Sequence, residues 1–191
     1  MRASTKRKIL CVLRILLTLL CLITIGYIFS NSLETGEKSA QKSNEVVQTV
    51  QKVVSYVAPQ SPIVTATGDA YDRLHDAIRV LAHFSEFAVL GALLIWCYFS
   101  YTVKKKHLYI PISMMLIVPI TDECIQLFSA GRGAQISDVL IDCLGCGIGG
   151  IFAVVSLGIV LWILSKQRNK KGQDVAVACY VCRKNVETEK E

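Results

Sequence analysis

The chain has 191 residues, of which 52% are hydrophobic and 19% are charged, and it carries a formal net charge of +6. The apolar residues form long runs rather than periodic stripes, which excludes an ordinary soluble domain and indicates a polytopic membrane protein. The lysines and arginines gather beside these runs, where they set membrane topology, so the charge gives no reason to expect a nucleic-acid partner.

Four apolar runs are long enough to cross a lipid bilayer, whose core of about 30 Å needs about 20 helical residues. They lie at residues 9–29, 82–103, 108–128 and 139–164. We therefore predict an all-α fold, a four-transmembrane-helix bundle with an extracytoplasmic helical loop. Its parts are a basic cytoplasmic leader at 1–8, the membrane domain at 9–165 and a disordered cytoplasmic tail at 166–191.

The first run follows a basic leader, an arrangement that secretory signal peptides share. No small-residue cleavage pattern follows Phe29, so we expect a retained span. Basic residues beside membrane spans face the cytoplasm. The leader, the lysines at 104–106 and the basic residues at 166–171 alternate to one side, which places both termini in the cytoplasm. The loops at 30–81 and 129–137 then face outwards.

The long outer loop contains a predicted amphipathic helix. Its apolar face consists of Val46, Val47, Val50, Val53, Val54 and Val57, which recur at helical spacing. This helix can lie in the outer headgroup region, cover the mouth of the bundle or act as a solvated spacer. Pro59 ends the pattern, and a second outer helix is expected from Asp69 into the second span.

Polar side chains occur near the outer ends of three predicted spans. They are His83 and Glu86, then Asp122, Glu123 and Gln126, then Asp138 and Asp142. Spacings of three or four residues place the members of each pair on one helix face. Ionisable groups in a membrane are costly and indicate a functional site by default. We expect these side chains to meet in an acidic pocket open to the outer leaflet.

Such an acidic cluster needs compensation, because carboxylates within about 4–6 Å of each other cannot all stay ionised. A cation can bind, some acids can keep a proton, or Arg132 and His83 can pair with them. A divalent metal ion is a candidate ligand of Glu86, Asp122 and Asp142; hard ions suit carboxylates, and a histidine admits zinc or manganese. The candidate catalytic residues are His83, Glu86, Asp122 and Glu123, and the candidate ligand-binding residues are Gln126, Arg132, Asp138 and Asp142.

Several of these residues also have simpler interpretations. Asp138 can cap the fourth span, where an acid suits the helix dipole. His83 and Glu86 can pair with each other alone, and Gln126 can be an interhelical hydrogen-bond residue. Arg132, in a glycine-containing turn, can receive a phosphate or carboxylate or can pair with the acids.

Small residues and cysteines carry weaker signals. Gly145 and Gly149 are four residues apart, which predicts the close approach of a neighbouring helix near Asp142. Cys179 and Cys182 have the spacing of metal ligands, but no second pair or histidine accompanies them. We therefore expect an inert pair rather than a zinc site.

Four sequence blocks, in order, resemble the VanZ-like membrane proteins. They are AHFSEFAVLG at 82–91, DECIQLF at 122–128, Gly131-Arg132, and DVLIDCLG at 138–145. The resemblance spans about residues 29–150 and includes Phe29-Ser30, Ser39 and Ser43. It implies a four-span bacterial envelope protein, in a family named after a member associated with low-level teicoplanin resistance. Ile125 stands where relatives often carry a histidine, which weakens any role that needs two histidines.

Together these features predict a protein of a Gram-positive-type cell membrane that binds or modifies a lipid-linked or cell-wall ligand, with an effect on glycopeptide susceptibility as one consequence. One alternative is a metal-assisted membrane enzyme, with His83 or Glu86 as general base. A second alternative is a small ion or proton carrier. A carrier needs polar residues deeper in the cytoplasmic half, where the sequence has almost none.

Overall fold

The computed structural model describes residues 3–102 and 104–188, and it describes side chains only through Arg168. The helices are α1 (Ala3–Ser32), α2 (Gly36–Val57), α3 (Asp69–Tyr101), the short 3-10 helix η1 (Lys105–His107), α4 (Tyr109–Gln126) and α5 (Ile136–Thr188). No strand occurs in the described residues, as the predicted all-α fold requires. The chain forms two compact units, Met1–Ala153 and Val154–Glu191, which are described separately.

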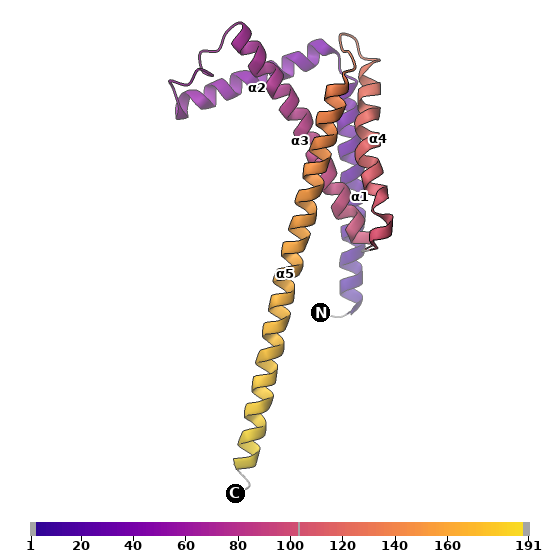
Figure 1. Cartoon of the computed structure of the whole chain (residues 1–191), viewed down its shortest axis with the longest axis vertical. Helices are drawn as coiled ribbons and strands as arrows, with labels where there is room; N and C mark the ends of the chain where they lie inside the picture. Colours follow the sequence, from indigo (N-terminus) through magenta and orange to yellow (C-terminus); the bar gives the residue numbers. More distant parts are fainter. Residues whose placement is uncertain (1–2, 103, 189–191) are drawn as a thin grey trace. The chain divides into compact units, whose positions relative to one another are not determined.

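In the first unit, α1, α3, α4 and the beginning of α5 pack along one another (Figure 1). Their shared core contains Ile28 from α1, Phe87 and Leu90 from α3, Val118 from α4 and Cys146 from α5. Apolar side chains pointing away from this core remain exposed along α1 and α5. Such outward apolar faces are expected where lipid replaces water as the solvent.

The prediction of four membrane spans is corrected to three. Within the described residues, three helices are long and apolar enough to cross a membrane: Arg7–Ser32, Asp69–Tyr101 and Ile136–Arg168. The third predicted span, 108–128, corresponds to α4, which has only 18 residues and contains Pro119. At 1.5 Å per residue α4 is about 27 Å long. Its polar last turns, with Asp122, Glu123 and Gln126, lower its mean hydropathy further.

Glycines allow α3 and α5 to approach closely beside the polar residues. A Cβ atom at Gly149 would collide with the carbonyl oxygen of Ala88, and one at Gly145 would crowd that of Phe84. Gly91 of α3 faces the backbone of Cys146 in the same way. This arrangement confirms the predicted close approach at Gly145 and Gly149, and it brings Asp142 against α3.

The segment that the sequence predicts to face outwards is a helical hairpin made of α2 and the first turns of α3 (Figure 1). Its connecting loop at 58–68 is held by Gln51, whose side-chain amide donates to the carbonyl oxygens of Ile63 at 3.1 Å and Ala66 at 3.3 Å. Thr35 caps α2 by accepting from the backbone N–H of Lys38. Helix α2 carries the predicted valine face, in which Val47 is fully buried whereas Val46, Val53 and Val57 are exposed.

The start of α2 docks on the loop between α4 and α5. The N–H of Gly36 donates to the carbonyl oxygen of Ala130 at 2.9 Å. A Cβ atom at Gly36 would collide with the carbonyl oxygen of Gly131, whose positive φ of 74° itself favours glycine. The predicted outer loop is thus tied to the short loop that carries Arg132.

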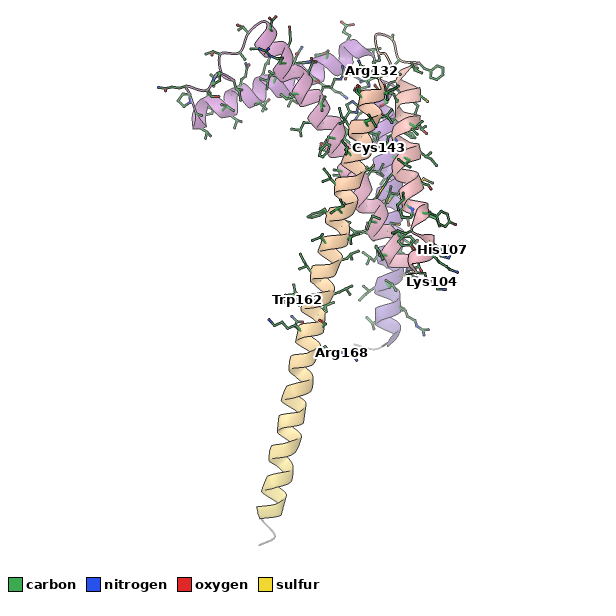
Figure 2. All side chains as sticks on the ribbon, in the orientation of Figure 1. Lys104, His107, Arg132, Cys143, Trp162 and Arg168 are labelled. Atoms are coloured by element: carbon green, nitrogen blue, oxygen red, sulfur yellow. The ribbon has the colours of Figure 1, made fainter. Side chains whose placement is uncertain are left out.

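The Lys104 end of the bundle lies opposite Arg132 (Figure 2). Here the guanidinium of Arg14 donates to the carbonyl oxygen of Ser100 at 2.8 Å and lies 5.2 Å from the ring centroid of Tyr101. The hydroxyl of Tyr98 donates to the carbonyl oxygen of Lys104. Polar groups at this end therefore have local partners.

The second unit consists of the later part of α5. The ammonium of Lys166 lies 5.3 Å from the ring centroid of Trp162. The helix continues to Thr188, through the segment for which the sequence predicts a disordered tail. The side chains of Cys179 and Cys182 lie outside the described part, as do Met1, Arg2, Val103 and the last three residues.

Candidate functional site

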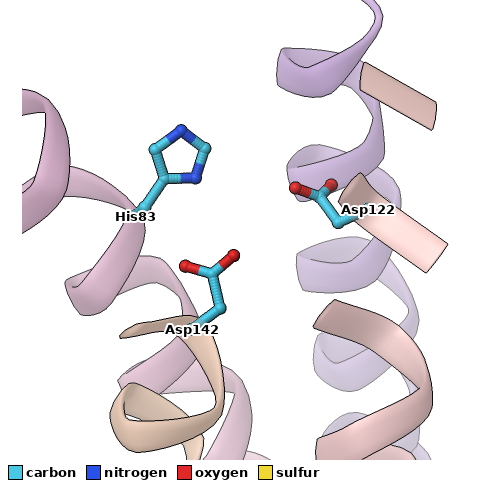
Figure 3. A group of neighbouring side chains, drawn as sticks. All are labelled: His83, Asp122 and Asp142. Atoms are coloured by element: carbon cyan, nitrogen blue, oxygen red, sulfur yellow. The ribbon is translucent and has the colours of Figure 1, made fainter. Parts of the chain in front are cut away.

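Three polar side chains from three different helices point toward one another inside the first unit (Figure 3). His83 comes from α3, Asp122 from α4 and Asp142 from α5, and one ligand-type atom of each lies within 4.8 Å of the others. Asp122 is 0% exposed and Asp142 is 1% exposed, whereas His83 is half-buried. We call these three residues the His-Asp-Asp cluster.

The carboxylate of Asp122 is oriented by two hydrogen bonds. The hydroxyl of Ser32 donates to Oδ1 at 2.6 Å, and the side-chain amide of Gln126 donates to Oδ2 at 3.1 Å. The hydroxyl of Ser129 in turn donates to the carbonyl oxygen of Ser32 at 2.7 Å. Gln126 therefore acts here on a carboxylate of its own helix, and α1 supplies the stronger support.

The carboxylate of Asp142 is buried without support. Neither of its oxygens has a hydrogen-bond partner among the described residues. A void of about 10 Å³ adjoins it, lined by Arg79, Val80, His83, Asp138, Ile141 and Asp142. This is about the room that one water molecule or ion occupies. Burying a carboxylate without a partner is strongly unfavourable, so a partner for Asp142 is expected in this space.

Glu86 lies outside the His-Asp-Asp cluster, although the sequence suggests it as a metal ligand. Its Oε1 accepts a hydrogen bond from the side-chain amide of Asn31 at 3.2 Å. Glu86 instead lines a cavity between α1, α2 and α3. The geometry thus places His83, rather than Glu86, with Asp122 and Asp142.

Glu123 and Asp138 hold the beginning of α5. The carboxylate of Glu123 accepts from the backbone N–H of Gln135 at 2.5 Å, while its other oxygen is buried without a partner in the part of the chain that the structure describes. Asp138 lies in the first turn of α5 and forms an ion pair of 3.6 Å with Arg79. Both acids lie near the positive end of the α5 dipole, which favours negative charge. These contacts fit a structural role for each residue.

The cavity that Glu86 lines has a volume of about 450 Å³ and is bounded by α1, α2, α3 and the Arg132 loop. Its polar lining includes Asn31, Glu34, Ser39, Lys42, Ser43, Arg79, His83, Ser85, Glu86 and Arg132. Its apolar lining includes Tyr27, Val46, Val50, Ile78, Leu81 and Ala82. Helix α2 forms one wall of this cavity.

Along the cavity, the charge of Glu34 has partners of opposite sign, whereas that of Arg132 has none among the described residues. Glu34 forms ion pairs with Lys42 at 2.6 Å and Lys38 at 2.9 Å, and these hydrogen-bonded ammonium groups lower the pKa of Glu34. The guanidinium of Arg132 forms no ion pair or side-chain hydrogen bond with the described residues. Burial, and next the positive charge of Arg79, lower the pKa of Arg132. Its cationic form would therefore gain from an added anion.

Arg132 also borders a second cavity, of about 220 Å³, which it shares with Arg79, His75, Gln126 and Gln135.

Sequence reasoning missed several residues that complete the site: Asn31, Ser32, Arg79 and Ser129. Asn31 and Ser32 directly follow the first apolar run, and polar residues at the end of a span were the signal that could have found them.

A bundle of long apolar helices with a buried polar cluster near one end defines an integral membrane protein with a polar site between its helices. Residues 15–161 match the model of the VanZ/LLP1 family. The match covers most of the chain, so the protein belongs to the VanZ/LLP1 family. No curated protein and no solved structure is significantly similar to the chain.

Proposed function

We propose that this VanZ-like envelope protein binds an anionic lipid-linked or cell-wall ligand in the cavity bounded by α1, α2 and α3. One observation carries the proposal: the half-buried guanidinium of Arg132 faces this cavity without a carboxylate partner. Guanidinium groups bind phosphate and carboxylate bidentately, so one of these groups is the expected anchor. The anchored group would replace the solvation that Arg132 loses by burial.

The rest of the cavity suits an amphiphilic ligand. Its volume of about 450 Å³ falls in the usual range of ligand sites, about 300–1,000 Å³. Tyr27, Val46 and Leu81 provide apolar surface beside the charged groups. A hydrocarbon chain would lie against this surface while its charged head meets Arg132.

The proposed orientation places the cavity at the outer leaflet. The basic leader, the lysines at 104–106 and the basic residues at 166–171 would face the cytoplasm with both termini. Arg132 lies at the end of the bundle opposite Lys104, and therefore on the outer side (Figure 2). In a Gram-positive-type cell this side faces the cell wall and its lipid-linked precursors, so occupancy of the cavity would alter teicoplanin susceptibility.

The direct test measures binding of a polyprenyl phosphate to the full chain in lipid nanodiscs by native mass spectrometry. Substitution Arg132→Gln should weaken binding about 10–100-fold, as expected for loss of charged hydrogen bonds. The matched control is Arg73→Gln, at an exposed position of α3 outside both cavities. Equal binding of the uncharged polyprenol would contradict the proposed anchor.

The cellular consequence is tested separately. A susceptible Gram-positive host that expresses the wild-type chain should differ in its teicoplanin inhibitory concentration from a host that expresses Arg132→Gln at equal level. Equal inhibitory concentrations would confine the proposal to ligand binding and remove the susceptibility effect.

A second candidate function is a metal-assisted membrane enzyme that acts on a lipid or envelope substrate. It is favoured because His83 both lines the cavity and belongs to the His-Asp-Asp cluster, so a ligand in the cavity would lie beside that cluster. Mass spectrometry of polyprenyl phosphate after incubation with the metal-loaded chain separates the two functions. An altered lipid mass that depends on Glu86 would identify an enzyme, and an unaltered mass a binding protein.

A further inference from the structure

We propose that His83, Asp122 and Asp142 form a binding site for one divalent transition-metal cation, with Zn²⁺ or Mn²⁺ as its occupant. The proposal concerns the His-Asp-Asp cluster itself and does not depend on ligand binding in the cavity. It differs from the metal site suggested by sequence, because the imidazole of His83 takes the place of the carboxylate of Glu86.

The geometry brings three metal-binding atoms to one point. Their mutual separations are all within 4.8 Å (Figure 3). Nitrogen and oxygen ligands bound about 2.0–2.2 Å from a tetrahedral zinc ion lie about 3.4 Å from one another. Small rotations of side chains on three separate helices suffice to reach that spacing.

A buried and unpartnered carboxylate independently points to a ligand. Asp142 is 1% exposed, and both of its oxygens lack a hydrogen-bond partner in the described residues. It borders, together with His83, the void of about 10 Å³. Since Asp122 is a second buried acid beside it, a dication offers the compensation that the single imidazole of His83 does not.

The surroundings hold the ligands in place, as metal sites require. Ser32 and Gln126 donate to the two oxygens of Asp122, which leaves further lone pairs of these oxygens for a metal. Support of this kind normally orients ligating carboxylates. Two oxygens and one nitrogen from the protein leave a coordination position open, because zinc and manganese take four or more ligands. The imidazole nitrogen disfavours Ca²⁺ and Mg²⁺, which prefer oxygen.

The experiment uses the full chain, tag-free and purified in detergent, carrying Cys179→Ser and Cys182→Ser to remove the other candidate thiol ligands. Chelator-treated protein is dialysed against ZnCl₂ or MnCl₂, and bound metal is counted by plasma mass spectrometry. We expect about one ion per chain from at least one of the two salts, and a rise in melting temperature on its addition.

Asp142→Asn and Asp122→Asn should each weaken that binding at least about 100-fold, more than the 10–100-fold typical for supporting residues. Asp76→Asn is the matched control, because Asp76 is exposed on α3 away from the cluster. Should a buried variant fail to fold, His83→Gln, at a half-buried position, carries the same prediction. Absence of stoichiometric zinc and manganese, or equal binding by His83→Gln, would overturn the site.

Discussion

The two ends of the helix bundle differ in how completely their polar groups are paired. At the Lys104 end, Arg14 and Tyr98 each have a backbone carbonyl partner from the neighbouring segment. At the Arg132 end, Asp142 and one oxygen of Glu123 are buried without partners among the described residues, and Arg132 has no counter-ion there. Paired groups of the first kind hold helices together, whereas each unpaired buried group needs an explanation, which for Asp142 is the proposed metal ion.

The largest expected effect comes from the helix contact on which the polar end depends. Gly149→Ala would push the backbone of Ala88 away and separate α3 from α5. We expect a loss of about 3 kcal/mol in the free energy of unfolding, measured in mixed micelles. Gly147→Ala is the control, since its Cβ would meet nothing within 4 Å. Equal stability of the two variants would show that the contact is looser than described.

A smaller difference should separate two hydroxyl deletions at opposite ends. Ser32→Ala removes the 2.6 Å hydrogen bond to buried Asp122 and should cost about 1–2 kcal/mol in chelator-treated protein. Thr18→Ala removes an exposed bond to Tyr101 and should cost less than about 0.5 kcal/mol. Unfolding in mixed micelles measures both, and a reversed order would contradict the contrast between the ends.

At the Lys104 end, replacing Arg14 should lower the stability of the fold only modestly. Arg14→Gln removes the 2.8 Å bond to Ser100 and the contact with Tyr101. The expected loss is about 0.5–1 kcal/mol in unfolding free energy. Arg7→Gln, on the same helix at an exposed position, should change little. A loss of several kcal/mol for Arg14→Gln would mean that this cation is as critical as the acids at the other end.

The smallest expected effect is the pH dependence of stability that comes from Glu34 at the cavity rim. The pKa of Glu34 is lowered by its hydrogen bonds to Lys42 and Lys38, so the unfolded state binds its proton more readily than the folded state. The stabilisation is complete above the unfolded pKa and disappears as pH falls through the lower folded pKa. Melting temperatures between about pH 6 and pH 3 should show this loss in the wild type, but not in Glu34→Gln.

The helices and the polar residues were readable from the sequence because long apolar runs and interrupting acids leave clear local signals. The predictions for the individual helices fared differently. Helix α4 is too polar to be a candidate span, since its proline and its polar last turns outweigh its apolar beginning. The predicted glycine contact of Gly145 and Gly149 appears as described. Helix α5 continues to Thr188.

The residues that make up the site could be predicted less well from the sequence. Spacing alone puts His83 and Glu86 on one face, and only the packing of α3 against α4 and α5 shows that His83 joins Asp122 and Asp142. Ser32 reaches Asp122 across 90 residues of sequence. No local pattern specifies such a contact, because it depends on how far each helix slides along its neighbour.

The junction of Gly36 with Ala130 has a mechanical consequence. One backbone hydrogen bond joins the first turn of α2 to the turn that presents Arg132, and the lack of a side chain at Gly36 allows this close approach. These two stretches, far apart along the polypeptide, are joined backbone to backbone. A displacement of the hairpin of α2 and α3 would therefore move the Arg132 loop directly.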